Sequence, residues 1–201
     1  MSISDDEYIL KWAKKVKAVN LLGGKCSKCG NLDVLVLSFH HPDNNKECQV
    51  GNILSYRWSI IEKEVLKCEL LCHNCHHELH FNENSLEKRH YELKIDLLKY
   101  KNAYECQECG YHGKNYCSLD FHHIDPKSKL FSVRDLGCSG KGNLGKIFIE
   151  IDKCSVICKN CHWKHKVHVS RFESLKDKIM LSSNNIKEKQ AKINRDMVVD
   201  M

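Results

Sequence analysis

The sequence has few aromatic residues and little proline: 8% of its 201 residues are aromatic and only 2 are proline. It contains no run of about 18 apolar residues, the length that a membrane-spanning helix requires, so we expect no membrane partner. No apolar run follows the acidic start at residues 1–7, which predicts that no export signal is present. Because 42% of the residues are hydrophobic, a core is possible, but other residues must support it.

Arginine is also scarce, with 5 residues against 27 lysines. Arginine is the usual reader of guanine edges, whereas lysine mostly contacts phosphates, so we expect limited base readout if nucleic acid is bound. The net charge of +6 is uneven: residues 1–84 contain 10 basic and 11 acidic residues, residues 85–170 contain 15 and 10, and residues 171–201 contain 7 and 5. The excess in the second half fits a polyanionic partner, although many proteins carry a similar charge.

Cysteine and histidine, in contrast, are abundant, with 13 residues of each. Because the number of cysteines is odd, complete disulfide pairing would leave one cysteine over. With no export signal expected, reduced cysteines that bind metal in an intracellular protein are the better interpretation. Cysteine and histidine therefore look like part of the scaffold.

The two halves of the chain repeat the same motifs in the same order. Each half has a Cys-x-x-Cys-Gly knuckle, then Phe-His-His, then Cys-x-x-x-Cys-x-Asn-Cys-His. The motifs lie at residues 26–30, 39–41 and 68–76 in the first half, and at residues 106–110, 121–123 and 154–162 in the second. Motif order is kept while the separation grows from 80 to 86 residues, which indicates a duplicated fold unit. We expect a first module at residues 1–84, a second at residues 85–170, and a tail at residues 171–201.

Each module is expected to open with a helix. Residues 5–22 and 85–100 both carry apolar side chains at spacings of three and four. Ser4 can cap the first of these helices, and Gly23 and Gly24 end it. The tail at residues 171–201 is polar and free of cysteine and histidine, so we expect a helix that frays toward its end.

Within each module, further elements follow the first knuckle. Short β-rich runs are expected at residues 34–39 and 118–121, and a second helix near Ile60 and near Ile147. A polar, glycine-containing loop is expected at residues 137–145. The last helix of each module should start at the second knuckle, carrying residues 76–80 in the first module and residues 162–168 in the second.

Two Cys-x-x-Cys pairs per module can close a tetrahedral four-cysteine zinc site, which would give the chain two structural Zn²⁺ ions. Such closed sites supply folding free energy and no chemistry. They matter here because each module is too small to fix an active site by its core alone. The predicted ligands are Cys26, Cys29, Cys72 and Cys75 in the first module and Cys106, Cys109, Cys158 and Cys161 in the second. The alternative is a set of buried cysteines without metal.

Five further cysteines have no partner at ligand spacing: Cys48, Cys68, Cys117, Cys138 and Cys154. Cys68 and Cys154 fall on the apolar side of runs that look helical. Free cysteine behaves as a small hydrophobic residue in such places, so these two are expected in the core.

The histidines form a separate set. The pairs at residues 40–41 and 122–123 end the predicted strands, where neighbouring side chains face opposite ways. His76 and His80 are four residues apart on a predicted helix, so they share a face and can bind one ion together. A site of His40, His76 and His80 would leave His41 free as a base, a combination suited to phosphodiester hydrolysis. The alternative is that these histidines cover the zinc knuckle or cap strands.

Taken as a set, these motifs resemble the bacterial and phage HNH endonucleases that have a zinc-stapled ββα-metal core. The resemblance covers residues 26–80 and 106–168. It implies an α+β fold with two small zinc-bound ββα-metal modules in tandem, each preceded by a helix.

The family also implies roles for the histidines. The first residue of each pair, His40 or His122, would bind the catalytic cation, and the second, His41 or His123, would be the general base. The helical residues His76 and His162 would be further ligands, and Mg²⁺ or Mn²⁺ is the expected ion. The cation would stabilise the leaving 3′ oxygen while water activated by histidine attacks the phosphorus.

The chain departs from the family pattern in two places. The central asparagine of many members is replaced by Lys-Cys at residues 67–68 and 153–154, and Asn74 and Asn160 either serve instead or are structural. The second departure is Lys166, which stands where the first module has His80. His165 and His168 lie nearby at shifted positions, which predicts that the second site is weakened, rearranged or inactive. Against that, the stretch at residues 119–126 of the second module is the better match to the family, so either copy is a candidate for the more active site.

Two classes of function follow from these observations. The first is a metal-dependent DNA endonuclease that works as a single-chain pseudo-dimer, with RNA or branched DNA as other possible substrates. The second is a non-catalytic nucleic-acid-binding or assembly protein built on degenerate modules.

Overall fold

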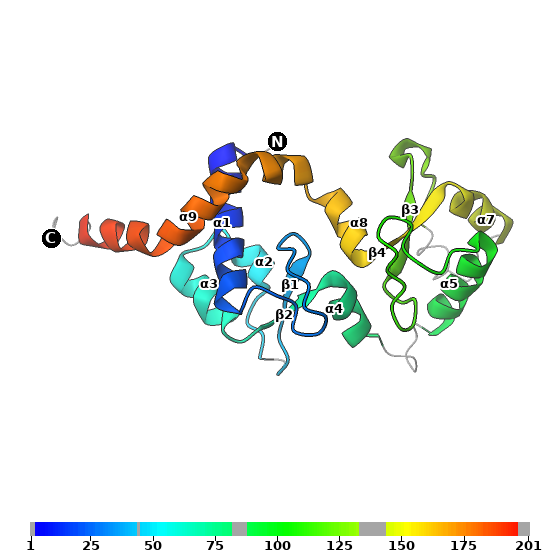
Figure 1. The fold of residues 1–201 in the computed structure, drawn as a ribbon, viewed down its shortest axis with the longest axis horizontal. Coiled ribbons are helices and arrows are strands. Elements are labelled where there is room, and N and C mark those ends of the chain that lie inside the picture. Colours follow the sequence, from blue (N-terminus) through cyan, green and yellow to red (C-terminus); the bar gives the residue numbers. More distant parts are fainter. Residues whose placement is uncertain (1–2, 44, 82–87, 133–143, 197–201) are drawn as a thin grey trace. The chain divides into compact units, whose positions relative to one another are not determined.

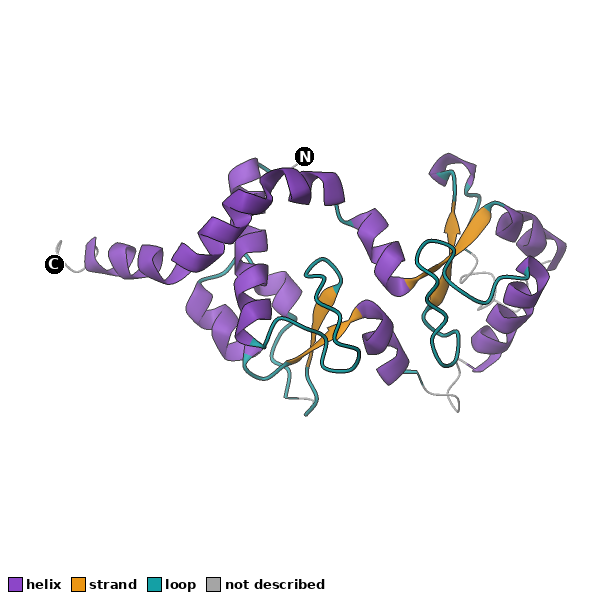
Figure 2. Cartoon of the chain, viewed as in Figure 1, coloured by secondary structure: helices purple, strands orange, loops and turns teal. Residues whose placement is uncertain are grey.

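The computed structural model describes residues 3–43, 45–81, 88–132 and 144–196, and Figure 1 and Figure 2 show helices together with two small sheets. No helix in these ranges is long and apolar enough to cross a membrane. The fold belongs to the α+β class. The elements in chain order are α1 (Asp5–Leu21), β1 (Leu37–His40), α2 (Val50–Ile53), α3 (Trp58–Val65), β2 (Glu69–Cys72), α4 (His73–Leu79), α5 (Lys88–Lys101), β3 (Leu119–His123), the 3-10 turn η1 (Pro126–Ser128), α7 (Leu144–Asp152), β4 (Cys154–Cys158), α8 (Lys159–Lys166) and α9 (Val169–Asp196).

Each sheet consists of two antiparallel strands. β1 pairs with β2 so that Leu37 lies opposite Cys72. β3 pairs with β4 in the same way, with Leu119 opposite Cys158. A helix follows the second strand directly in both cases, α4 after β2 and α8 after β4. The sequence repeat is therefore also a repeat of strand, strand and helix.

Contacts divide the chain into two compact units. One contains residues 1–72 and 167–201, and the other contains residues 73–166. The border between them falls after β2 and before α4. The modules at residues 1–84 and 85–170 are defined by repeated sequence motifs, whereas the two units are defined by contacts within the structure. The boundaries of the modules and of the units therefore differ.

Helix α1 begins and ends as the sequence predicts. The Ser4 hydroxyl accepts a hydrogen bond from the Glu7 backbone N–H at 3.3 Å, and the Glu7 carboxylate accepts one from the Ser4 N–H at 3.4 Å. This capping box satisfies N–H groups that have no partner inside the helix. Gly23 and Gly24 follow its end with φ of +90° and +73°, a conformation that glycine adopts without a side-chain clash.

Helix α9 packs along α1 in the first unit (Figure 1). Its residue Phe172 is 3% exposed and lies edge-on to Trp12, with ring centroids 4.8 Å apart. The guanidinium of Arg171 donates to the Asp5 carboxylate at 2.7 Å, next to the start of α1. The predicted C-terminal helix is therefore confirmed, and it is a packed part of the first unit through its first half. Residues 197–201, where a frayed end was expected, lie outside the described residues.

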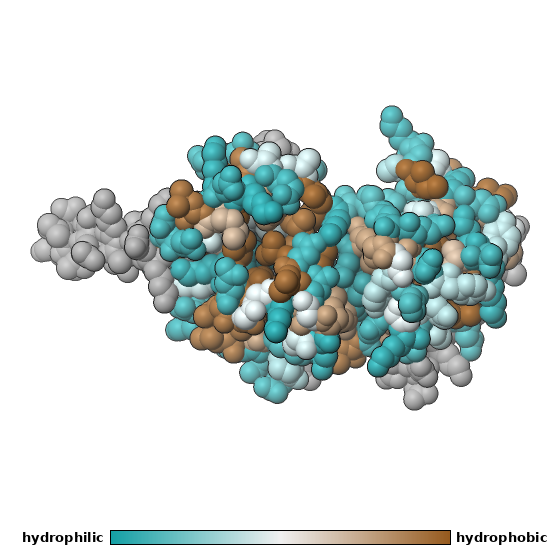
Figure 3. All heavy atoms as spheres, viewed as in Figure 1, coloured by the Kyte–Doolittle hydropathy of each residue, from teal (hydrophilic) through white to brown (hydrophobic). Residues whose placement is uncertain are grey.

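The core of the second unit lies between its sheet and the helices around it. Leu97 of α5 packs with Ile147 and Ile151 of α7. A second cluster joins the sheet to the zinc-ligand cysteines and consists of Leu98, Ala103, Cys106, Leu119, Val156, Ile157, Cys158 and Cys161. Figure 3 shows hydrophilic residues over most of this unit on the face drawn, with small hydrophobic patches among them. The core is small, which leaves part of the stabilisation to the cysteine groups.

Most of the predicted elements are found, with one clear error. The second helices near Ile60 and Ile147 are confirmed as α3 and α7, and the last helices as α4 and α8. Cys68 and Cys154 were placed on helical runs, but Cys154 begins strand β4 and Cys68 immediately precedes β2. The start of the helix expected at residues 85–100 and most of the loop expected at residues 137–145 lie outside the described residues.

We predict that Phe172→Ala destabilises the first unit by about 3 kcal/mol or more, because it removes a buried ring and leaves a cavity against Trp12. Thermal or urea unfolding monitored by Trp fluorescence measures the change. Leu181→Ala on the same helix is the matched control, since that side chain is 66% exposed and should cost little. Equal losses in the two variants would contradict the packing of α9 on α1.

Candidate metal centres and active site

The cysteines predicted as zinc ligands gather into two groups. Within each group the four sulfur atoms lie within 4.8 Å of one another. Sulfurs bonded to one tetrahedral zinc at about 2.3 Å are about 3.8 Å apart. The observed separations are 3.7 Å between Cys29 and Cys72 and 3.8 Å between Cys109 and Cys158. Both groups, Cys26, Cys29, Cys72 and Cys75 and Cys106, Cys109, Cys158 and Cys161, therefore fit structural zinc sites.

The backbone conformation explains why a glycine follows each first knuckle. Gly30 and Gly110 have φ of +74° and +72°, in the left-handed region that other residues rarely adopt. Their backbone N–H groups donate to the carbonyl oxygens of Cys26 at 2.9 Å and Cys106 at 2.8 Å. The same tight turn is thus built twice, and it brings the two sulfurs of each knuckle to one side.

Each first knuckle also docks on the strand that carries the second one. The backbone N–H of Ser27 donates to the carbonyl of Leu70 in β2 at 2.8 Å. Its counterpart Gln107 donates to the carbonyl of Val156 in β4 at 2.9 Å. These bonds link the first cysteine pair of each module to the strand that leads to the second pair.

Backbone donors favour the thiolate form of the first cysteine in each group, whereas burial raises the pKa of Cys109 to about 11 and also raises that of Cys161. Burial alone would raise the pKa of Cys26, but backbone N–H groups of Cys72, Cys29 and Lys28 outweigh it and lower the pKa to about 7. Backbone donors likewise lower the pKa of Cys106. Because thiolate is the form that binds zinc, the backbone donors favour zinc binding by Cys26 and Cys106.

In the first module, three predicted histidine ligands come close together. One ring nitrogen each from His40, His76 and His80 lies within 4.8 Å of the others. His40 ends β1, His76 is in α4, and His80 directly follows that helix. The rings of His76 and His80 are 4.9 Å apart, as their spacing of four residues predicts. The three nitrogens can therefore converge on one ion.

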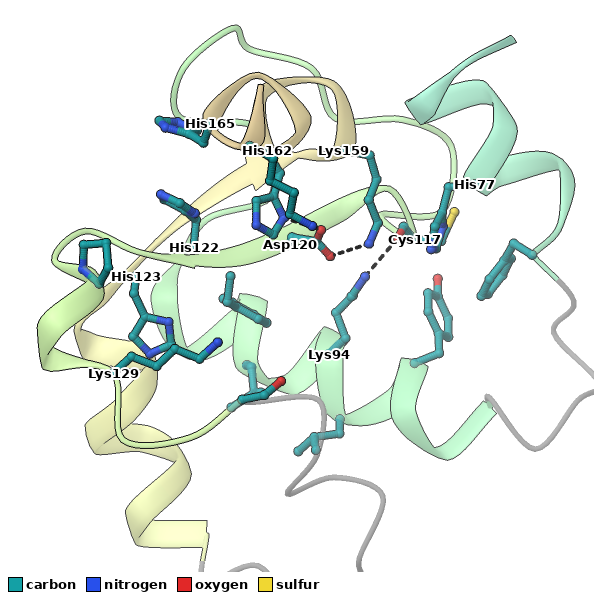
Figure 4. Close-up of a pocket in the computed structure, with 18 residues that line it drawn as sticks. His77, Lys94, Cys117, Asp120, His122, His123, Lys129, Lys159, His162 and His165 are labelled. Carbon is teal, nitrogen blue, oxygen red and sulfur yellow. Dashed lines mark hydrogen bonds and ion pairs between the residues drawn. The ribbon is translucent and has the colours of Figure 1, made fainter. Parts of the chain in front are cut away.

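The second module arranges its histidines differently. The His122 ring lies 5.2 Å from that of His162 and stacks at 4.4 Å on that of His165 (Figure 4). His162 Nδ1 bonds to an Asp120 carboxylate oxygen at 2.8 Å, and His165 Nε2 bonds to Glu108 at 2.6 Å. These carboxylates orient the two rings. Among the described residues, no triad like that of the first module forms around His122.

The two predicted bases occupy equivalent, nearly buried positions. His41 Nε2 lies 2.8 Å from a carboxylate oxygen of Glu64, and His123 Nε2 lies 2.7 Å from one of Glu150. The side chains of His41 and His123 are 7% and 9% exposed. Both glutamates come from the helix that precedes the second strand, Glu64 from α3 and Glu150 from α7.

Each glutamate is held as an ionised group inside the protein. Glu64 also accepts from the Lys67 ammonium at 2.9 Å and from the backbone N–H of Cys48 at 3.1 Å. Burial alone would raise the pKa of Glu64, but Lys67 and the backbone donors lower it to about 2. The ammonium of Lys153, 2.9 Å away, and the backbone N–H of Leu130 likewise lower the pKa of Glu150 to about 2.

The ionised glutamates determine where the histidine protons lie. A carboxylate can only accept hydrogen bonds, so the Nε2 atom of each base must carry a proton. In a neutral imidazole, Nδ1 is then unprotonated and can accept a proton. The arrangement therefore presents His41 and His123 in the tautomer that a general base needs.

These glutamates were not among the predicted site residues, although a signal for them is present in the sequence. Glu-x-x-Lys-Cys occurs at residues 64–68 and again at residues 150–154. The Lys-Cys part was interpreted as a loss of the family's asparagine. The motif occurs in both modules, and its cysteine lies four residues before the second knuckle. This repetition could have identified a glutamate and a lysine that lie one helical turn apart.

Asn74 and Asn160 have a structural role in the observed fold. The Asn74 backbone N–H donates to the side-chain oxygen of Asn160 at 3.1 Å, and the Asn160 N–H donates to that of Asn74 at 2.9 Å. Each amide thereby caps the first turn of the other helix, α4 or α8, where backbone N–H groups lack partners. Asn74 is also 3% exposed, so it is placed to pack rather than to contact substrate.

The remaining described cysteines are not placed as ligands. Burial raises the pKa of Cys68 to about 12 and that of Cys154 to about 11, so both stay as thiols. Each thiol donates to the carbonyl of the glutamate four residues earlier at 3.3 Å. Cys48 is half-buried and Cys117 is buried. Cys138 lies outside the described residues.

A hollow of about 660 Å³ opens beside the second histidine set (Figure 4). It is lined by His122, His123 and His162 together with Lys129, Lys159 and Lys166, and by aromatic side chains of α5 and β3. Lys159 donates to Asp120 at 2.7 Å, which leaves cationic groups in excess on its wall. Such a lining suits an anionic ligand with apolar parts.

We predict that the purified chain contains about two zinc ions, and that Cys109→Ser lowers this to about one. The loss of one thiolate opens the second group, so unfolding of the second unit should occur at lower temperature. Elemental analysis and thermal unfolding measure the two effects. Cys48→Ser is the control because Cys48 belongs to neither group, and its zinc content should not change. A full zinc content in Cys109→Ser would contradict the site.

Comparison with known proteins gives no assignment for this chain. No family model matches it, and no curated protein or solved structure matches it. Function is therefore inferred from the geometry and chemistry of the sites themselves.

Proposed function

We propose that the chain is a metal-dependent endonuclease of the HNH type that hydrolyses phosphodiester bonds in DNA. The observation that carries the proposal is the pairing, repeated in both modules, of a histidine at a strand end with a buried ionised glutamate. This pairing stands next to a second histidine that is a candidate metal ligand. A base and a cation site side by side are the two parts that hydrolysis of a phosphodiester requires.

In this proposal His40, His76 and His80 hold a divalent cation in the first module, and His122 and His162 hold one in the second. A bound cation would supply charge stabilisation at the phosphate and the leaving 3′ oxygen. Imidazole donors favour transition-metal ions over Mg²⁺, which prefers oxygen ligands. Of the two ions expected from the family, Mn²⁺ therefore fits this donor set better.

The proton transfer rests on groups of this chain. His41 or His123 accepts a proton from water through Nδ1 while its Nε2–H donates to Glu64 or Glu150. The glutamate stabilises the positive charge that develops on the ring, and the ammonium of Lys67 or Lys153 keeps that glutamate ionised. The activated water then attacks phosphorus, and the bond from phosphorus to the leaving oxygen breaks.

Two modules in one chain support action as a single-chain pseudo-dimer that nicks both strands of a duplex. The excess of lysine over arginine favours phosphate contacts with limited base readout. Phosphate chemistry does not distinguish DNA from RNA or branched DNA, so these substrates belong in the same assay. The cysteine groups keep the separate role of holding each module together.

A second candidate function is a non-catalytic nucleic-acid-binding or assembly protein. It is favoured by the second module, where Lys166 replaces a ligand and His165 is already paired with Glu108. A chain with two zinc ions and no further divalent-ion binding would match this function. Titration of the zinc-loaded protein with Mn²⁺ separates the two candidates, because the endonuclease must bind an additional ion.

We predict that the protein with Mn²⁺ converts supercoiled plasmid to nicked and linear forms. The double variant His41→Ala/His123→Ala should lower the rate by about 100-fold or more, because it removes the base from both modules. Agarose gels of a time course measure the rate, and elemental analysis shows whether the zinc content is kept. Unchanged cleavage by a variant with full zinc content would refute the assigned bases.

We also predict a loss of activity in Glu64→Gln/Glu150→Gln. A glutamine can turn its amide N–H₂ toward Nε2, which moves the ring proton to Nδ1, the atom that must accept from water. We expect kcat to fall by about 10-fold or more with little change in KM, as a positioning group for the base requires. Glu92→Gln is the matched control, since this glutamate is exposed on α5. Wild-type kcat in the double variant would remove the glutamates from the mechanism.

A further inference from the structure

A second hollow, of about 310 Å³, brings histidines of both modules to one place. Its lining includes His76 and His80, candidate ligands of the first module, and His162, a candidate ligand of the second. All of its lining residues belong to the compact unit of residues 73–166. The reciprocal asparagine bonds between α4 and α8 hold the helices that carry His76 and His162.

Lys166 lies on the wall of both hollows. It lines the hollow with His76 and His80 and also the larger one with His122 and His123. The two hollows share further lining residues, among them Lys159 and His162, so they adjoin. A nucleic-acid strand following this lining would pass the histidines of both modules.

The charges around Lys166 leave its ammonium available for an anion. Asp120, which lines both hollows, is already balanced by Lys159 at 2.7 Å and bonded to His162 at 2.8 Å. Lys166 is exposed, and within the described part of the chain its ammonium has no hydrogen bond or ion pair. It therefore adds an unbalanced positive charge to a wall that also carries imidazoles.

We propose that Lys166 binds a phosphate of the substrate at the site of the first module, so that one module supplies a binding residue to the other. This rests on the proposed function and deepens it. Lys166 stands where the first module has the candidate ligand His80. In this proposal it binds no metal ion in its own module and instead contacts the nucleic-acid strand bound at the first module. Lysine suits this role because it is a long, flexible point charge that contacts phosphates without reading bases.

Binding tests the proposal without cleavage. In the His41→Ala/His123→Ala background, fluorescence anisotropy with a labelled DNA duplex gives Kd as a function of salt. Lys166→Ala should weaken binding by about 10-fold and lower the salt slope by about 0.9, the change expected for one lost phosphate contact. Lys164→Ala, which removes the same charge from the same helix but lines neither hollow, should change both less. Equal effects of the two variants would overturn the proposal.

Cleavage tests which module Lys166 serves. In the His123→Ala background, where only the first module keeps its base, Lys166→Ala should raise KM by about 10-fold with little change in kcat, and Lys166→Arg should restore KM. If Lys166 is instead a degenerate ligand of its own module, Lys166→Ala leaves KM unchanged there. Lys166→His would then raise second-module cleavage in the His41→Ala background. That pair of results refutes the proposal.

Failure of the proposed function has a different signature. A wild-type protein that cleaves no nucleic acid with any divalent ion would refute the endonuclease. The anisotropy measurement would still decide whether Lys166 binds the phosphate backbone. Loss of DNA binding in Lys166→Ala alone would then support the phosphate contact in a binding protein.

Discussion

Closure of each four-cysteine group joins parts of a module that lie far apart along the chain. One cysteine pair forms a tight turn near the module's start, and the other spans the junction of the second strand with the last helix. His76 and His162 come directly after the final cysteine of each group. Fixing that cysteine therefore sets the first turn of α4 or α8, and with it the place of the next imidazole. Without this constraint, a core as small as that of the second unit would leave the histidines free to separate.

The second constraint is a buried carboxylate. A buried charge is costly unless hydrogen bonds and an opposite charge compensate for it. Glu64 and Glu150 meet both conditions, with lysine on one oxygen and histidine on the other. The same groups that make the charge tolerable also set the histidine tautomer, so stability and the proposed reactivity depend on one network. The same order of Glu, Lys and Cys within five residues occurs in both modules, so both build the same network.

The sequence predicted what local pattern and ligand spacing can determine. The capping box of Ser4, the second helices near Ile60 and Ile147, and the two cysteine groups all depend on residues close in sequence or on a known coordination number. The pairing of His41 with Glu64 could not be predicted in this way, because it joins a strand end to a helix 23 residues later. Cys154 was placed in a helix because strand β4 is short and mostly apolar, and such runs show no period that separates strand from helix.

The contact between Asn74 and Asn160 shows how a duplicated sequence can become one structure. Each residue caps the helix of the other, so the loss of either side-chain amide leaves a backbone N–H at the start of the partner helix without its acceptor. The two copies are thereby coupled at the helices that carry their candidate ligands, and they can diverge while the contact remains. The first copy keeps His80, whereas the second has Lys166 beside a wider hollow. This divergence fits the proposed division of roles, in which the first copy keeps a histidine as a metal ligand and the second contributes Lys166 as a phosphate contact.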